Sequence, residues 1–165
     1  MTNGAAVRGR PLHHVALMPR DPEASLRFYR DGLGLQELAD FAGLVGQWRH
    51  LFGAPADELR SIFLGDPDHG NAGVVELVLF DAAVPPEASA PAMGAGGFML
   101  LSFYVADVGG TMARLGELGV CDDPKTTTIG EGDGVFTVGT VRDPDGTLIE
   151  LVGLPPEQGF GSSTS

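Results

Sequence analysis

The sequence predicts an α+β protein made of two similar halves, each a strand, a helix and three further strands. Short apolar runs bounded by Gly, Pro or Asp predict the strands. Two segments with helix signals each follow one of these runs, and the order of strand, helix and further strands occurs twice along the chain. The 25 glycines and 12 prolines among 165 residues fit short strands and tight turns better than a helical bundle. A chain of this length buries roughly 70% of its unfolded surface, so it needs neither metal nor disulfide to fold.

Six runs are rich in Val, Leu, Ile or Phe and are short enough to be strands. They are Leu12–Met18, Ser61–Leu64, Val74–Phe80, Phe98–Val105, Val135–Val141 and Thr147–Val152. Residues 41–60 fit no single pattern, and one helical turn within a long loop is the interpretation that they favour.

The first helix is predicted by its N-terminal signals. Asp21 suits the N-cap, Pro22 the first helical position and Glu23 the first turn. We expect this helix to run to about Arg30 and to stop at Gly32.

The second helix is predicted by its apolar periodicity. It begins near Asp107 and ends at Gly119. Its apolar residues recur at spacings of four, three and three: Val108, Met112, Leu115 and Leu118.

The two halves align at fixed offsets. Asp21 and Asp107 precede the two helices and lie 86 residues apart, whereas Glu76 and Glu150 in the closing strands lie 74 apart. The difference reflects a longer loop around residues 41–72. One half alone leaves sheet edges and an apolar face uncovered, so we expect the two to pack together.

Composition shifts predict the domain boundaries. The predicted segments are a flexible tail over 1–10, a first module over 11–80, a linker over 81–97, a second module over 98–154 and a flexible tail over 155–165.

Charge and cysteine content exclude several classes of partner. With 22 acidic against 10 basic residues the net charge is −12, which disfavours nucleic acid and anionic membranes. No apolar run reaches the length of a membrane span, and no secretory signal precedes Pro11, so we expect a cytoplasmic protein. The single cysteine, Cys121, excludes an intramolecular disulfide and a cysteine-rich zinc site.

Three ionisable residues lie on apolar strand faces. Alternation places His14 on one face with Ala16, Glu76 among valines, and Glu150 beside Leu148. A carboxylate in such a position is costly to bury unless it is paired or bound to metal. Taken alone, each is more often a solvent-facing or satisfied residue. Together, at matching ends of a duplicated unit, they favour one shared site.

The other histidines are given no role in this site. Alternation places His13 on the face opposite to His14. His50 and His69 lie in predicted loops and are expected on the solvated surface.

Four segments carry a resemblance to a known family. They are LHHVALMPRDPEASLRFYRDGLGL, GVVELVLF, LLSFYVADVGGTMARLGELGV and VRDPDGTLIELV. The chain resembles the vicinal oxygen chelate superfamily of glyoxalases, bleomycin-resistance proteins, extradiol dioxygenases and epimerases over about residues 11–154. The most specific piece is the turn around Gly146 that leads into the strand of Glu150. The resemblance implies two βαβββ modules forming a partly open barrel around a divalent metal, and a homodimer.

Residue by residue, the resemblance implies a ligand set of His14, Glu76 and Glu150. The fourth family position, usually histidine, falls on Leu100, which cannot bind metal. Extradiol dioxygenase chemistry is therefore disfavoured, because it needs a second histidine. One imidazole and two carboxylates still suit a divalent ion such as Zn, Ni, Mn, Fe or Co.

Two functions remain open. In the first, a metal-dependent lyase or isomerase acts on a small oxygen-chelating carbonyl substrate through an enolate, with Glu150 or Glu76 as the base. The substrate pocket then includes Leu100, Ser102 and Tyr104. In the second, the protein binds a small molecule without metal or chemistry, as the bleomycin-resistance branch does.

Overall fold

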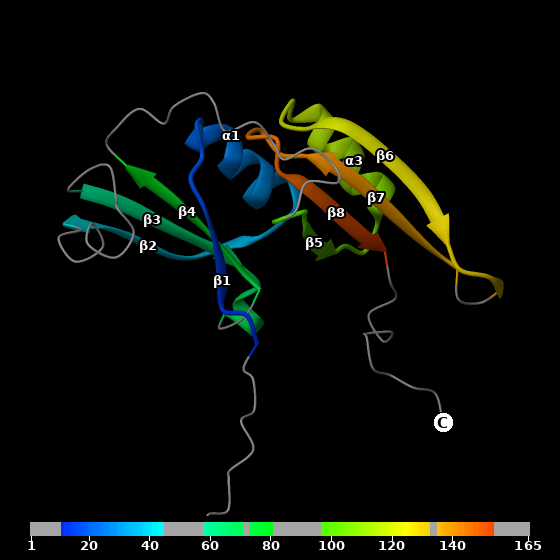
Figure 1. The fold of residues 1–165 in the computed structure, drawn as a ribbon, viewed down its shortest axis with the longest axis horizontal. Helices are drawn as coiled ribbons and strands as arrows, with labels where there is room; N and C mark the ends of the chain where they lie inside the picture. The colour runs from blue at the N-terminus through cyan, green and yellow to red at the C-terminus, as the bar shows by residue number, and fades with distance from the viewer. Residues whose placement is uncertain (1–10, 45–57, 71–72, 81–96, 133–134, 154–165) are drawn as a thin grey trace, which may run out of the picture. The chain divides into compact units, whose positions relative to one another are not determined.

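The computed structural model describes residues 11–44, 58–70, 73–80, 97–132 and 135–153 (Figure 1). The predicted tails, most of the predicted linker and His50 lie outside these residues. The elements of the first half are β1 (His14–Leu17), α1 (Pro22–Leu26), the π-helical segment η1 (Arg27–Gly32), β2 (Gln36–Leu44), β3 (Glu58–Gly65), the 3-10 turn η2 (Pro67–His69) and β4 (Val74–Phe80). Those of the second half are β5 (Leu101–Tyr104), α3 (Val108–Glu117), β6 (Asp122–Ile129), β7 (Phe136–Arg142) and β8 (Leu148–Gly153).

Two open four-stranded sheets of the same topology contain these strands. Their strand orders are β1-β4-β3-β2 and β5-β8-β7-β6. In each sheet the first and last strands of the half pair in parallel, and the remaining pairs are antiparallel. The α+β class and the two βαβββ modules are thereby confirmed.

The strand register also repeats. Ala16 lies opposite Glu76 in the first sheet, and Ser102 lies opposite Glu150 in the second. The two pairs differ by the offsets of 86 and 74 residues that the sequence predicted. Equivalent positions of the two sheets can therefore be compared directly.

Contacts group the chain into two compact units. One contains residues 1–18 and 36–81, and the other contains residues 19–35 and 82–165. The helix α1–η1 of the first half thus belongs to the unit of the second sheet, where the Arg114 side chain on α3 donates to the Gly32 carbonyl at 2.8 Å. The predicted boundaries at 81–97 remain a prediction.

Both helices begin where the sequence predicts. The Asp21 carboxylate caps α1 by accepting from the Ala24 N–H at 3.1 Å, with Pro22 in the first position. α3 follows Asp107, and the chain after it turns at Gly119, whose φ of +64° favours glycine.

α3 covers one face of the second sheet. A Cβ atom added to Gly139 in β7 would lie 2.8 Å from Val108 Cγ1 of α3, so this glycine allows close packing of helix on sheet. Ile149 and Leu151 in β8 are buried on the same face. Glu150, by alternation, lies on the face away from α3.

Three strands differ wholly or in part from the sequence prediction. The described parts of 41–60 are extended in β2 and β3 instead of helical, with Phe41 paired to Ser61. β6 was not predicted, and every residue in it is exposed.

None of the described helices has the length and apolar character needed to cross a membrane.

Candidate functional site

His14 and Glu76 lie together on one face of the first sheet. β1 and β4 are parallel neighbours in register, so the two side chains are diagonal neighbours on that face. His14 Nε2 and Glu76 Oε2 are 3.3 Å apart, with side-chain exposures of 39% and 13%. The pair therefore combines a nitrogen and an oxygen donor at a half-buried position.

His13 is a second imidazole at this point. Its Nδ1 lies 2.6 Å from Nδ1 of His14, and the two rings meet edge to face. The prediction that His13 faces away from His14 is wrong, because β1 begins at His14 and strand alternation does not extend to the residue before it. The ring of His14 thus contacts His13 through one nitrogen and Glu76 through the other.

Glu150 lies in the second sheet with a hydroxyl partner. Ser102 in the neighbouring strand β5 donates to Glu150 Oε2 at 2.6 Å. Tyr104 is on the same face and is 58% exposed. Leu100 precedes β5 and is half-buried. The pocket role of these residues remains a prediction.

The pair in the first sheet fits two ligands of one metal ion. Two donor atoms about 2.1 Å from a tetrahedral ion lie about 3.4 Å apart, close to the observed 3.3 Å between His14 Nε2 and Glu76 Oε2. Within the described part of the chain, no three His, Cys, Asp or Glu side chains are grouped to hold an ion. The fit thus rests on these two donors.

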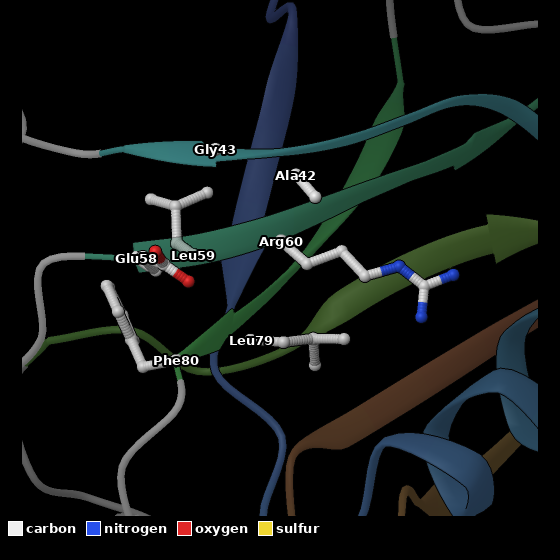
Figure 2. A pocket seen from close by; sticks show the side chains of 7 residues that line it. All are labelled: Ala42, Gly43, Glu58, Leu59, Arg60, Leu79 and Phe80. Atoms are coloured by element: carbon white, nitrogen blue, oxygen red, sulfur yellow. The ribbon is translucent and has the colours of Figure 1, made fainter.

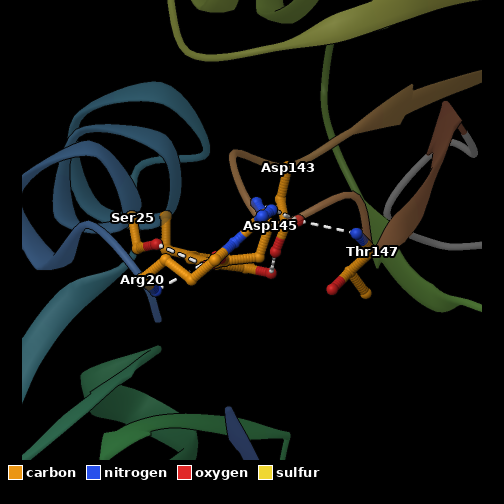
Figure 3. Close-up of polar contacts among 6 residues, drawn as sticks. Arg20, Ser25, Asp143, Asp145 and Thr147 are labelled. Atoms are coloured by element: carbon orange, nitrogen blue, oxygen red, sulfur yellow. Dashed lines mark hydrogen bonds and ion pairs between the residues drawn. The ribbon is translucent and has the colours of Figure 1, made fainter. Parts of the chain in front are cut away.

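The predicted turn around Gly146 is confirmed, and the helix α1–η1 packs on it (Figure 3). The Gly146 N–H donates to the Asp143 carbonyl at 2.9 Å, and φ at Gly146 is +89°. The Asp143 carboxylate accepts from the N–H groups of Asp145 and Thr147. Asp145 in turn accepts from the backbone and side chain of Arg20.

Tyr29 completes this arrangement from η1. Its hydroxyl donates to Asp143 Oδ2 at 2.7 Å, and both side chains are buried. Burial first, and then the charge of Asp143, raise the pKa of Tyr29 far above its usual range. Burial also raises the pKa of Asp143, against the effect of the Tyr29 hydrogen bond. No local pattern in the sequence indicates this pair, because its members lie 114 residues apart.

Two further features of the first unit are an exposed histidine–aspartate pair and a groove. His69 in η2 is exposed as predicted and lies 3.0 Å from Asp66, whose hydrogen bond raises the pKa of the imidazole. The first unit also has a groove of ≈ 310 Å³, and Figure 2 shows the side chains that line it. It is lined by Ala42, Gly43, Glu58, Leu59, Arg60, Leu79 and Phe80. The Arg60 guanidinium contacts the Asp40 carboxylate.

Comparison with known proteins agrees with the duplicated βαβββ modules. The model of the Glyoxalase/Bleomycin resistance protein/Dioxygenase superfamily matches residues 11–151. The chain belongs to this superfamily. It is 36% identical over 151 residues to the lactoylglutathione lyase-like protein terB of Aspergillus terreus, covering 87% of this chain and 75% of that protein.

Solved structures share the fold. A glyoxalase family protein from Bacillus cereus superimposes with a TM-score of 0.61 at 19% identity, over 92% of this chain and 97% of that one. The trypanothione-dependent glyoxalase I of Leishmania major superimposes with a TM-score of 0.56 at 24% identity, over 87% and 86%. At these identities the likeness concerns the fold alone.

Proposed function

We propose that the protein is a divalent-metal-dependent lyase or isomerase acting on a small carbonyl compound with two neighbouring oxygens. The observation that carries this proposal is the 3.3 Å approach of His14 Nε2 and Glu76 Oε2 on one sheet face. The similarity to a lactoylglutathione lyase-like protein supports the reaction class.

His14, Glu76 and Glu150 would hold the ion, which when bound supplies Lewis acidity toward the substrate oxygens. The protein's own groups move the proton. Glu76 or Glu150 removes a proton from the carbon beside the carbonyl, leaving an enolate, and returns it to complete the reaction. The Ser102 hydroxyl fixes Oε2 of Glu150 and leaves the other carboxylate oxygen for this work.

Elemental analysis of protein purified without chelator tests the ligand set. We expect about one first-row divalent ion per chain in the wild type and a sharp loss in Glu150→Ala, because only two protein ligands then remain. His69→Ala, which alters the exposed pair with Asp66, is the matched control and should keep the ion. If metal occupancy were unchanged in Glu150→Ala and lost in His69→Ala, the ion would lie near His69 and the proposed ligand set would be wrong.

Proton exchange tests the chemistry without knowledge of the natural substrate. With metal-loaded protein, the protons beside the carbonyl of hydroxyacetone should exchange with D₂O faster than in buffer, as followed by proton NMR. Removing the base by Glu76→Gln or Glu150→Gln should slow exchange about 10²- to 10⁴-fold for the glutamate that acts. Exchange no faster than in buffer would contradict the enolate route.

A metal-free binding protein is the second candidate, and Leu100 favours it. Leu100 occupies the position equivalent to His14, and its side chain is half-buried. In a metalloenzyme, Leu100→His should tighten metal binding by adding a ligand. In a binding protein, the same change places an unpaired polar group at this half-buried position, costs at most about 3 kcal/mol and brings no gain in metal affinity. Metal titration by calorimetry with a melting curve separates the two.

Assembly, partners and location complete the proposal. We expect a cytoplasmic homodimer whose partner is a small molecule and which binds neither nucleic acid nor membranes. The net charge of −12 supports the last point. Light scattering on the full chain measures the oligomeric state, and a monomeric mass would contradict the dimer.

A further inference from the structure

We propose that Phe41 and Phe63 form a binding subsite for an aromatic or other planar apolar group of the substrate. This inference rests on the proposed function, since it assigns the apolar end of a substrate whose oxygens lie at His14 and Glu76. It narrows the substrate class to neutral carbonyl compounds that carry a ring beside their two oxygens.

The two rings continue the site across the first sheet. Phe63 in β3 lies directly opposite Glu76, and its ring meets the His14 ring edge to face at 5.9 Å. Phe41 in β2 meets Phe63 edge to face at 6.0 Å. Phe41, Phe63 and His14 therefore form a continuous aromatic row beside the Glu76 carboxylate.

Exposure changes along this row. The His14 side chain is 39% exposed, Phe63 is half-buried and Phe41 is 61% exposed, and the neighbouring Glu76 side chain is 13% exposed. An apolar ring left in water is unfavourable, and covering it would be favourable. The row therefore offers uncovered aromatic surface that begins at the candidate ligands and extends toward the strand β2 at the sheet edge.

The second sheet shows that the fold does not require these rings. Thr140 lies opposite Glu150 as Phe63 lies opposite Glu76. Thr127 lies opposite Val138 as Phe41 lies opposite Ser61. The same topology thus accepts threonine at both equivalent positions. The aromatic row belongs to the first sheet, where the imidazole ligand is also found.

The chemistry of the row selects its occupant. Two rings expose far less surface than the roughly 800 Å² that each partner buries in a stable protein interface, so a small molecule suits them better than a second chain. Aromatic side chains bind rings in offset or edge-to-face arrangements. The net charge of −12 disfavours an anionic ligand. A neutral ketone with a ring on one side and a second oxygen on the other meets all three conditions.

The test compares two neutral ketones that differ only in the group the row would bind. 2-Hydroxyacetophenone carries a phenyl group where hydroxyacetone carries a methyl group, and both present the same two oxygens. Calorimetry with the metal-loaded full chain should show at least about tenfold tighter binding of the phenyl ketone. Phe41→Thr and Phe63→Thr introduce the threonines of the second sheet, and each should weaken that binding about 3- to 10-fold and leave hydroxyacetone unchanged.

The control and the opposing outcomes keep this inference separate from the proposed function. Phe98→Ala removes a similarly exposed phenylalanine outside the row and should preserve the phenyl preference. Equal binding of both ketones by the wild type would overturn the subsite, as would an equal loss of both ketones in the two threonine variants. Proton exchange on hydroxyacetone reports the proposed function independently, because that ketone has no ring for the row to bind.

Discussion

Replacing Tyr29 with phenylalanine removes one hydroxyl from a buried pair and keeps the ring. Tyr29 is fully buried, and its hydroxyl donates to Oδ2 of the buried Asp143 at 2.7 Å. Oδ1 of Asp143 is held separately by the N–H groups of Asp145 and Thr147 at 3.0 and 2.7 Å. The variant therefore leaves one carboxylate oxygen without its donor and the turn otherwise intact.

The expected cost follows from the charge of the acceptor. A hydrogen bond to a charged group contributes about 1.5–3 kcal/mol, against about 0.5–1.5 kcal/mol for a neutral pair. We expect Tyr29→Phe to lower the free energy of unfolding by about 1.5–3 kcal/mol where the Asp143 carboxylate that accepts this hydrogen bond is charged. For a chain of this size that corresponds to a melting temperature lower by about 3–12 °C.

The pKa shifts of Asp143 and Tyr29 determine how the stability cost of Tyr29→Phe changes with pH. The folded pKa of Asp143 is raised, so its contribution to stability is present below about pH 4 and is lost as pH rises through the folded pKa. Without the Tyr29 hydroxyl that pKa rises further, and the cost of the variant should be smaller at pH 4 than at pH 7. The pKa of Tyr29 is also raised. Above pH 10 the wild type should therefore lose about 1.36 kcal/mol per pH unit that the variant does not lose.

Urea unfolding followed by circular dichroism measures the free energy of unfolding of the wild type and the variant at pH 4, 7 and 10.5. Tyr104→Phe, which removes a hydroxyl from an exposed ring, is the matched control and should change stability little at any pH. A cost of less than about 0.5 kcal/mol at pH 7, by the usual standard for surface changes, would refute the assigned role of the pair. A cost independent of pH would refute the charge argument.

Three further changes test the packing and the turn of the second unit. Gly139→Ala should cost about 1–3 kcal/mol in urea unfolding, because its Cβ would lie 2.8 Å from Val108 Cγ1; wild-type stability would contradict the close packing. Gly146→Ala should cost about 1–2 kcal/mol, because φ is +89°, and an unchanged melting temperature would count against a left-handed turn residue. Arg20→Ala should cost less than about 1 kcal/mol in the same assay, since its pair with Asp145 is partly exposed; a larger loss would show that this pair carries the turn.

The sequence predicted those elements whose signals are local. The cap at Asp21, the stop at Gly119 and the turn at Gly146 each follow from one residue type in one backbone position. The central strands β4 and β8 were predicted because their apolar residues are buried within a sheet. Local chemistry and burial pattern were sufficient for these.

The strands β2 and β6 could not be predicted in this way. Each lies at an edge of its sheet, and all residues of β6 are exposed, so no apolar alternation distinguishes them from loops. β6 also contains Pro124, which argues against a strand except at an edge. Pairing with the neighbouring strand determines these elements.

The candidate site shows the same division between local and long-range information. His14 and Glu76 were singled out by position in duplicated strands, and the register of β1 and β4 brings them together. The contact of His14 with His13 depends on where β1 begins. The row from His14 through Phe63 to Phe41 depends on the order of four strands. None of these can be read from one segment of the chain.

The two sheets share a register but differ in the chemistry they present, and this difference bears on function. Around Glu76 the first sheet places an imidazole and an aromatic ring. Around Glu150 the second sheet places the hydroxyl of Ser102 and the side chain of Thr140. Each sheet forms the same topology without the residues that the other sheet places around its glutamate. The fold therefore requires neither set of residues. Selection on a ligand with an oxygen-bearing end and an apolar end would produce this asymmetry, which is why the ketone comparison probes the first sheet and the glutamate variants probe both.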